Sequence, residues 1–227
     1  MTGDIGEFIP GVVDDPVHDP AIVKDPSNQT YYVFSTGILR NPQDPGGIFV
    51  RRSTGSLAGP WESLGEIAVP EWTREYGHSH LWAPQVVRQG QTYYLYYAAS
   101  SFGQNTSAIG VASTRTPGDL DSWEDHGPVV TSQADVDEYN AIDPHVFKAD
   151  GRWWIAFGSH WTGMRLQELA SMPKPPGRST GWPIGKCRPT PSRLPRSSSG
   201  EVLLPADVVG QVLRRHGQHA PGRRRPV

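Results

Sequence analysis

The sequence has a single cysteine, Cys187, among its 227 residues, which excludes an internal disulfide framework. No apolar run approaches the roughly 20 residues that cross a bilayer, so no membrane partner is expected. Residues 1–14 lack a basic segment followed by an apolar core, and no signal peptide is therefore visible. Only 19% of the residues are charged. Glycine (25), proline (22), tryptophan (8) and tyrosine (8) are plentiful instead, which is typical of strands and turns rather than a helical bundle.

The charges are distributed unevenly along the chain. Residues 170–227 contain eleven Lys and Arg against two acidic residues, a net charge of +9, whereas residues 1–169 carry −11. A basic segment can bind nucleic acid, and steeply salt-dependent retention on DNA would indicate that function. This segment has one aromatic residue and is rich in Pro, Arg and Ser. We therefore interpret residues 170–227 as a disordered basic tail with no nucleic-acid partner.

One phrase occurs three times: an Asp-Pro or Ala-Pro step, an apolar run, a polar turn and paired aromatic residues. Its prolines, Pro20, Pro84 and Pro144, are 64 and 60 residues apart, which indicates a repeated supersecondary unit. Each copy predicts two antiparallel strands joined by the turn, with a third strand after them. The first two copies are followed by a Trp-Glu step that can open a fourth strand. Four such strands make a β-propeller blade, so we expect an all-β fold with three recognisable blades in residues 1–169.

Two copies of the phrase begin with an aspartate, Asp19 or Asp143. Because the innermost strands of a propeller line its central channel, both carboxylates are expected at one end of that channel. Glycoside hydrolysis needs such a pair, one carboxylate activating water and the other tuning a carboxylic acid. An Asp before Pro also caps turns without any catalytic role, and spacing alone leaves both interpretations open.

Aromatic and polar residues cluster near the same phrases. Aromatic planes stack on sugar rings and polar side chains bond their hydroxyls, which suggests a sugar-binding set. The predicted set is His18, Trp82, Phe102, Asn140, Ser159, His160 and Trp161. Further candidates are His80, Asn105 and Tyr139. Aromatic residues on the strands themselves, such as Tyr93 and Trp153, fit an ordinary core equally well. No histidine pair has a helix-borne metal spacing, so no metal site is predicted.

Four phrases in series carry a family resemblance. They are residues 17–20 (Val-His-Asp-Pro), 81–86 (Leu-Trp-Ala-Pro-Gln-Val), 139–147 (Tyr-Asn-Ala-Ile-Asp-Pro-His-Val-Phe) and 157–163 (Phe-Gly-Ser-His-Trp-Thr-Gly). Together they closely resemble the endo-α-1,5-L-arabinanases of glycoside hydrolase family 43. The resemblance, over residues 14–169, implies a five-bladed β-propeller that hydrolyses arabinan with inversion.

The resemblance also implies roles and surroundings. Asp19 matches the general base, and Asp143 matches the residue that raises the pKa of the general acid and orients it. Arabinan and arabino-oligosaccharides are the implied substrates, outside the cell, and no cofactor is required. The family's channel cation, calcium or similar, has no identifiable ligand in this sequence.

The general acid itself is missing. In the family it is a Glu in a Glu-Ala-Pro phrase, which this sequence lacks. Codons for residues 189–195 can read Asn-Ala-Ile-Glu-Ala-Pro in another frame, and codons for residues 201–219 can read as a paired-aromatic strand in a third. We therefore hypothesise that the chain is truncated or frameshifted after about residue 169 and expect it to be nearly inactive. Nucleotide sequence that encodes no blade-like peptide in either frame would refute the frameshift.

Three alternatives to an arabinanase remain open at this point. One is another specificity on the same scaffold, a β-xylosidase or an α-L-arabinofuranosidase, which activity on linear arabinan and on an aryl-xyloside would separate. The second is a carbohydrate-binding fragment without catalysis, whose sugar binding would survive Asp19→Ala. The third is nucleic-acid binding through the basic tail.

Overall fold

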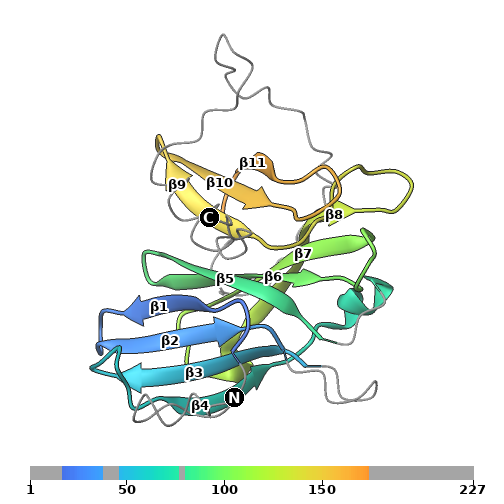
Figure 1. The fold of residues 1–227 in the computed structure, drawn as a ribbon. Helices are drawn as coiled ribbons and strands as arrows, with labels where there is room; N and C mark the ends of the chain where they lie inside the picture. Colours follow the sequence, from blue (N-terminus) through green and yellow to red (C-terminus); the bar gives the residue numbers. More distant parts are fainter. Residues whose placement is uncertain (1–16, 38–45, 77–79, 174–227) are drawn as a thin grey trace, which may run out of the picture. The chain divides into compact units, whose positions relative to one another are not determined.

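The computed structural model describes residues 17–37, 46–76 and 80–173, which form three antiparallel sheets (Figure 1). The first sheet has the strand order β1 (Ala21–Asp25), β2 (Thr30–Ser35), β3 (Ile48–Thr54) and β4 (Glu62–Ile67). The second has the order β5 (Trp82–Gln89), β6 (Thr92–Ala99), β7 (Ser107–Thr114) and β8 (Glu124–Ser132). The third contains β9 (His145–Ala149), β10 (Arg152–Phe157) and β11 (Arg165–Leu169). Two 3-10 helices, η2 (Glu71–Tyr76) and η3 (Leu120–Ser122), lie in the connections.

Each sheet is a meander in which strands adjacent in sequence are hydrogen-bonded neighbours, and this is the form of a propeller blade. The predicted all-β fold is confirmed. Every polar turn predicted between the first two strands forms a hairpin whose tip has a positive φ, at Gln29, at Gly90, and at Asp150 with Gly151. The paired aromatics begin the second strand of each sheet, as predicted.

The middle sheet is buried on both faces. Strand β6 has no exposed residue, because its side chains alternate between two hydrophobic clusters. Leu95 and Tyr97 pack in a cluster with Phe34 of the first sheet. Tyr94 and Tyr96 pack in a second cluster with residues of the third sheet. The aromatic residues of β6 are therefore core residues, which explains why β6 is apolar throughout instead of alternating.

The predicted basic tail, residues 170–227, lies outside the described residues from residue 174 onward. Its first residues still pack on the middle sheet. The hydroxyl of Tyr94 donates to the carbonyl of Pro173 at 2.9 Å, and Met172 packs in the second cluster. No helix in the described ranges is long and apolar enough to cross a membrane.

A polar clamp fastens η2 to the middle sheet. The Asp125 carboxylate accepts hydrogen bonds from the hydroxyl of Tyr97 and, at 2.8 Å, from Nε1 of Trp72. The two rings pack over Gly110, where a Cβ would lie 2.6 Å from Tyr97 and 2.7 Å from Trp72. Burial raises the pKa of Tyr97 well above its usual value, so this hydroxyl stays a neutral donor. Asp125 is therefore the acceptor for two donors, one of which, the Tyr97 hydroxyl, belongs to a buried residue.

Replacement of Asp125 by alanine is expected to lower the free energy of unfolding by about 1–3 kcal/mol, because it leaves the buried Tyr97 hydroxyl without its acceptor. Urea denaturation of the purified chain measures this loss. Glu124→Ala is the matched control, since Glu124 is the adjacent, exposed acid of β8, and its cost should stay within about 0.5 kcal/mol. Equal losses in the two variants would contradict the clamp.

Candidate active site

One pocket of about 960 Å³ is lined by Trp82 of β5 and by residues of the connections next to all three sheets. Both predicted carboxylates, Asp19 and Asp143, line it. So does the entire predicted sugar-binding set, His18, Trp82, Phe102, Asn140, Ser159, His160 and Trp161. The pocket is also lined by residues that the sequence did not single out, Thr36, Gly37, Ser101, Gly103, Gln104 and Ile142, and by the further candidate His80. Positions up to 143 residues apart in the sequence thus share one cavity, as the propeller prediction requires.

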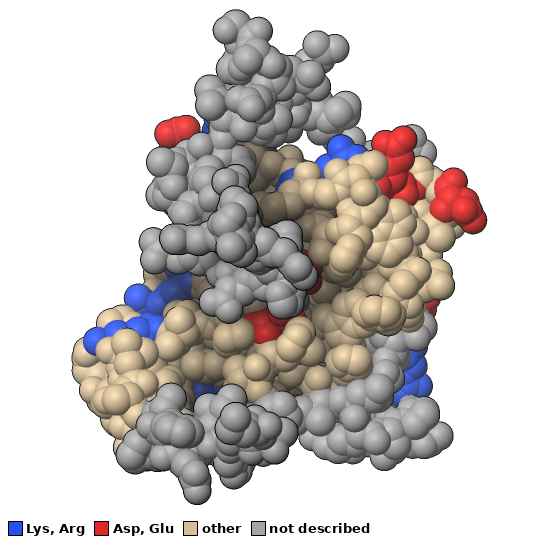
Figure 2. Space-filling view, in the orientation of Figure 1, with Lys and Arg blue, Asp and Glu red and all other residues tan. Residues whose placement is uncertain are grey.

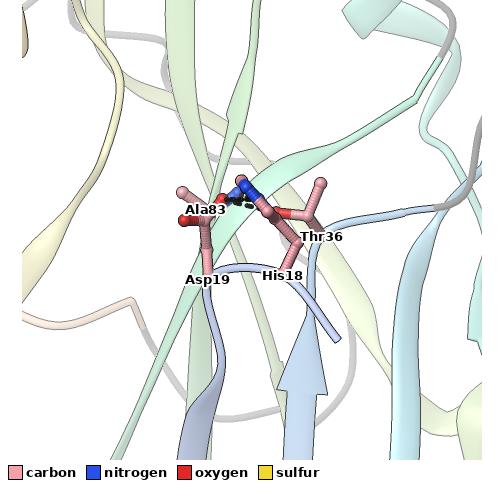
Figure 3. Close-up of polar contacts among 4 residues, drawn as sticks. All are labelled: His18, Asp19, Thr36 and Ala83. Atoms are coloured by element: carbon pink, nitrogen blue, oxygen red, sulfur yellow. Dashed lines mark hydrogen bonds and ion pairs between the residues drawn. The ribbon is translucent and has the colours of Figure 1, made fainter. Parts of the chain in front are cut away.

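The Asp19 carboxylate is held through one of its oxygens (Figure 3). Oδ2 accepts a hydrogen bond from the Thr36 hydroxyl at 2.9 Å and one from Nδ1 of His18 at 2.7 Å. Within the described ranges, no residue bonds Oδ1, and 38% of the Asp19 side chain is exposed. One oxygen is therefore anchored while the other is left for a molecule in the pocket.

The first residue of each repeat has an unusual backbone. Asp19, Ala83 and Asp143 each precede a proline, and their φ angles are 49°, 30° and 55°. A residue before proline normally adopts an extended conformation, and residues other than glycine rarely have positive φ. Such backbone strain is concentrated at functional sites. The strain here occurs at three equivalent corners, of which Asp19 and Asp143 line the pocket and Ala83 follows the lining residue Trp82.

A buried polar network fixes the loop that leads to Asp143. Nδ2 of Asn105 donates to the carbonyls of Asp137 and Tyr139, at 2.9 and 3.2 Å. The Ser132 hydroxyl donates to the carbonyl of Asn105 and accepts from the backbone N–H of Ala141. Asn105, a further sugar-binding candidate, therefore lies behind the pocket wall rather than among its lining residues. The other candidate, Tyr139, is also absent from the lining and donates to the Thr131 carbonyl at 2.9 Å.

Two exposed aromatic side chains flank the pocket. Phe102 is 96% exposed, in a turn where the N–H of Gln104 donates to the carbonyl of Ser101. Trp161 is 47% exposed and has a φ of 41°. Its neighbour Thr162 fastens the loop, because its N–H and its hydroxyl both donate to the carbonyl of Glu138, at 3.1 and 2.6 Å. Aromatic planes held this way can stack on sugar rings.

Two buried polar atoms at the pocket have no hydrogen-bond partner among the described residues, Oδ1 of Asn140 and Nε1 of Trp82. The Asn140 amide nitrogen, in contrast, donates to the carbonyl of Gln104. A buried polar atom left unpaired costs about 1–3 kcal/mol, so each such atom needs an explanation. Both atoms are buried, so a sugar hydroxyl could pair with them only if their side chains turn toward the pocket. Beside Trp82, burial lowers the pKa of His80, which keeps that ring uncharged at neutral pH.

In the described part of the chain, no three His, Cys, Asp or Glu residues are grouped so that they could hold a metal ion. The absence of a metal site therefore stays a prediction, and no chemical step below uses a cation.

The antiparallel blades enclose a largely apolar pocket with a few polar groups, in which two carboxylates lie just before the first strands and aromatic side chains are exposed. These features define a class, the β-propeller proteins that process carbohydrate. Residues 11–176 match the family profile described as glycosyl hydrolases family 43. The chain belongs to this family, and its three sheets are blades of the family's five-bladed propeller fold.

The relatives and solved structures that the chain resembles are arabinan-degrading enzymes. It is 38% identical over 157 residues to arabinan endo-1,5-alpha-L-arabinosidase A of Aspergillus niger, covering 69% of this chain and 46% of the relative. It is 36% identical over 173 residues to the extracellular exo-alpha-(1->5)-L-arabinofuranosidase of Cellvibrio japonicus, covering 73% and 47%. Native Bacillus subtilis arabinanase has a TM-score of 0.60 at 37% identity, covering 68% of this chain and 52% of that structure. The chain spans about half the length of the curated relatives it matches.

Proposed function

We propose that this chain carries the general base and the acid-modulating carboxylate of an inverting glycoside hydrolase that cleaves α-1,5-linked arabinan internally. The observation that supports this most strongly is the convergence of Asp19, Asp143 and the predicted sugar-binding residues on one pocket. The relatives are named as endo- and exo-acting enzymes of arabinan, which supports the choice of substrate.

In the proposed reaction, Asp19 takes a proton from a water molecule whose oxygen attacks the anomeric carbon. The bond from that carbon to the leaving sugar oxygen breaks, and this oxygen must receive a proton from a general acid. Inverting enzymes hold base and acid roughly 6.5–9.5 Å apart, which leaves room for the water. Asp143 would raise the pKa of that acid and orient it.

The proposed substrate suits two kinds of residue in the pocket lining. Phe102 and Trp161 offer exposed rings for stacking, while Asn140 and Trp82 offer buried polar atoms for sugar hydroxyls. A solved relative, a Cellvibrio cellulosa arabinanase with a TM-score of 0.59 and 34% identity, was determined with arabinohexaose bound. Arabinohexaose is therefore the probe we choose for binding, and no cofactor is needed in the assay.

Endo and exo action are distinguished by the products released from linear arabinan. An endo enzyme releases a range of oligosaccharides from linear arabinan at early times, whereas an exo enzyme releases one short product from chain ends. The exo alternative is kept because the Cellvibrio japonicus relative is named as an exo enzyme. That relative is also named as extracellular, and we propose the same location for this protein, which fractionation of the producing culture tests.

The described surface does not favour nucleic acid, and the basic tail on which that alternative rests lies outside the described residues from residue 174 onward. On the face shown in Figure 2, Lys and Arg form separate small groups rather than one continuous basic surface. A phosphate-binding groove requires several adjacent cations, since each neutralised phosphate contributes to the salt-dependent affinity. We propose polysaccharide as the partner because the relatives are named as enzymes that act on arabinan.

Replacement of Asn140 by leucine, which has a similar size, is expected to weaken binding of arabinohexaose about tenfold or more, equivalent to ~1.4 kcal/mol. The physical reason is the loss of the buried Oδ1 acceptor and of the amide that bonds Gln104. Isothermal titration calorimetry measures the affinity. Tyr139→Phe is the control, because it removes a hydrogen bond in the same loop outside the pocket lining. Wild-type affinity in Asn140→Leu would contradict this binding role.

A further inference from the structure

The Thr36 hydroxyl has two neighbours that determine its direction (Figure 3). Its oxygen lies 2.9 Å from the backbone N of Ala83 and 2.9 Å from Oδ2 of Asp19. The Ala83 N–H can only donate, so the hydroxyl oxygen accepts from it. A hydroxyl has one proton to give, and an ionised carboxylate can only accept. The Thr36 proton therefore points at Oδ2 of Asp19.

The Ala83 N–H is available because the strand is irregular at this point. Trp82 pairs with Ala98 and Gln85 pairs with Tyr96, so two residues of β5 oppose one residue of β6. Such a bulge takes an amide out of the regular ladder and aims it elsewhere. Ala83 is the second copy of the repeat corner, and it shares the positive φ of the two aspartates. The copy of the repeat that has alanine in place of aspartate thus supplies its backbone N–H as a donor to Thr36.

Thr36 is itself fixed by the backbone on both sides. Its N–H donates to the carbonyl of His18 at 3.0 Å, and the N–H of Gly37 donates to the carbonyl of Leu81 at 2.8 Å. Gly37 cannot be replaced easily, because a Cβ there would lie 2.3 Å from the carbonyl oxygen of Gly47. The hydroxyl therefore has little freedom to move away from Asp19.

We infer that Thr36, oriented by the Ala83 amide of the neighbouring sheet, is a positioning residue that makes Oδ1 the proton-accepting oxygen of Asp19. Oδ2 already accepts two hydrogen bonds, from Thr36 and His18, and has the less favourable site for another proton. Oδ1 takes the proton of the attacking water, whose oxygen forms the new bond to the anomeric carbon. The bond from that carbon to the leaving oxygen breaks, and its electron pair goes to that oxygen. This inference rests on the proposed function and assigns the geometry of its base.

The test compares Thr36→Val, which keeps the shape and removes the hydroxyl, with Thr36→Ser, which keeps the hydroxyl. With a nitrophenyl α-L-arabinoside as substrate, Thr36→Val should lower kcat by about 10- to 100-fold at nearly constant KM, because small errors in the position of a reacting group have costs of that order. Thr36→Ser should retain kcat within about threefold of wild type, since a change of that size is under ~0.7 kcal/mol. A purely structural role would not be rescued by serine in this way.

Crystal structures of both variants give a second readout that needs no activity. The Asp19 carboxylate should keep its position in Thr36→Ser and leave it, or occupy more than one position, in Thr36→Val. An unmoved Asp19 together with wild-type kcat in Thr36→Val would overturn the inference. Failure of the proposed function looks different, because Asp19→Asn would then hydrolyse the arabinoside as fast as the wild-type chain.

Discussion

Replacement of Asp19 by asparagine is expected to lower the rate of nitrophenyl α-L-arabinoside hydrolysis by about 10²–10⁴-fold, the usual contribution of a general base. Asparagine has nearly the same shape and its oxygen can still accept from the Thr36 hydroxyl, but it cannot take a proton from water. Binding of arabinohexaose should stay near the wild-type affinity, because the pocket keeps its aromatic and polar lining. A large fall in kcat with unchanged binding would indicate that Asp19 acts as a general base rather than as a residue that only contacts the sugar.

The rate is measured by release of nitrophenolate, and binding by calorimetry. Asp25→Asn is the matched control, since it makes the same substitution at the far end of β1, where the Asp25 carboxylate accepts hydrogen bonds from the N–H and the hydroxyl of Ser27 and lies outside the pocket lining. The control should hydrolyse the substrate at the wild-type rate. Unchanged hydrolysis in Asp19→Asn would remove Asp19 from the mechanism.

The second large effect concerns the leaving group. The unaltered 227-residue chain is expected to hydrolyse linear arabinan at least about 10²-fold more slowly than the nitrophenyl arabinoside, because the acid-dependent step lacks its usual assistance. Nitrophenolate departs without a proton, whereas a sugar oxygen needs one. Asp19 and Asp143 are the only carboxylates among the described residues that line the pocket, and the sequence has no Glu-Ala-Pro phrase.

Both rates are measured on the purified chain. A reducing-sugar assay gives the rate on arabinan, and release of nitrophenolate gives the rate on the nitrophenyl arabinoside. Efficient release of arabino-oligosaccharides from arabinan would mean that the chain contains a competent acid, and the proposed impairment would be wrong. The nucleotide sequence across residues 165–227 provides an independent check, because it tests whether a Glu-Ala-Pro phrase is encoded in another frame.

The fold could be predicted from the sequence because short stretches of residues specify each strand and turn. Alternating apolar runs, polar turns and paired aromatics recur at the first two strands of each blade, so a repeat in the sequence becomes a repeat in space. The convergence of Asp19 and Asp143 followed from that topology alone. The predicted basic tail lies outside the described residues after residue 173, and its boundary stays a prediction.

The site residues that could not be predicted are those whose role depends on the direction in which a loop side chain points. Asn105 looked like a sugar ligand, but its amide is used by two backbone carbonyls, and no spacing rule reveals that choice. Thr36 was missed for the opposite reason, since a threonine after a strand is unremarkable by itself. A signal did exist: small hydroxyl residues follow the aromatic strand of every blade, at Thr36, Ser101 and Ser159, and all three line the pocket. Only Ser159 was predicted.

At the three strained corners before proline, the backbone conformation and the side chain vary independently. Their backbone is nearly the same whether the side chain is aspartate, as at positions 19 and 143, or alanine, as at position 83. A positive φ at these corners thus does not require an aspartate, and the side chain alone decides whether a corner carries a carboxylate. A lineage of enzymes built on this plan can change what a corner does through a single codon, without having to rebuild the cavity around it.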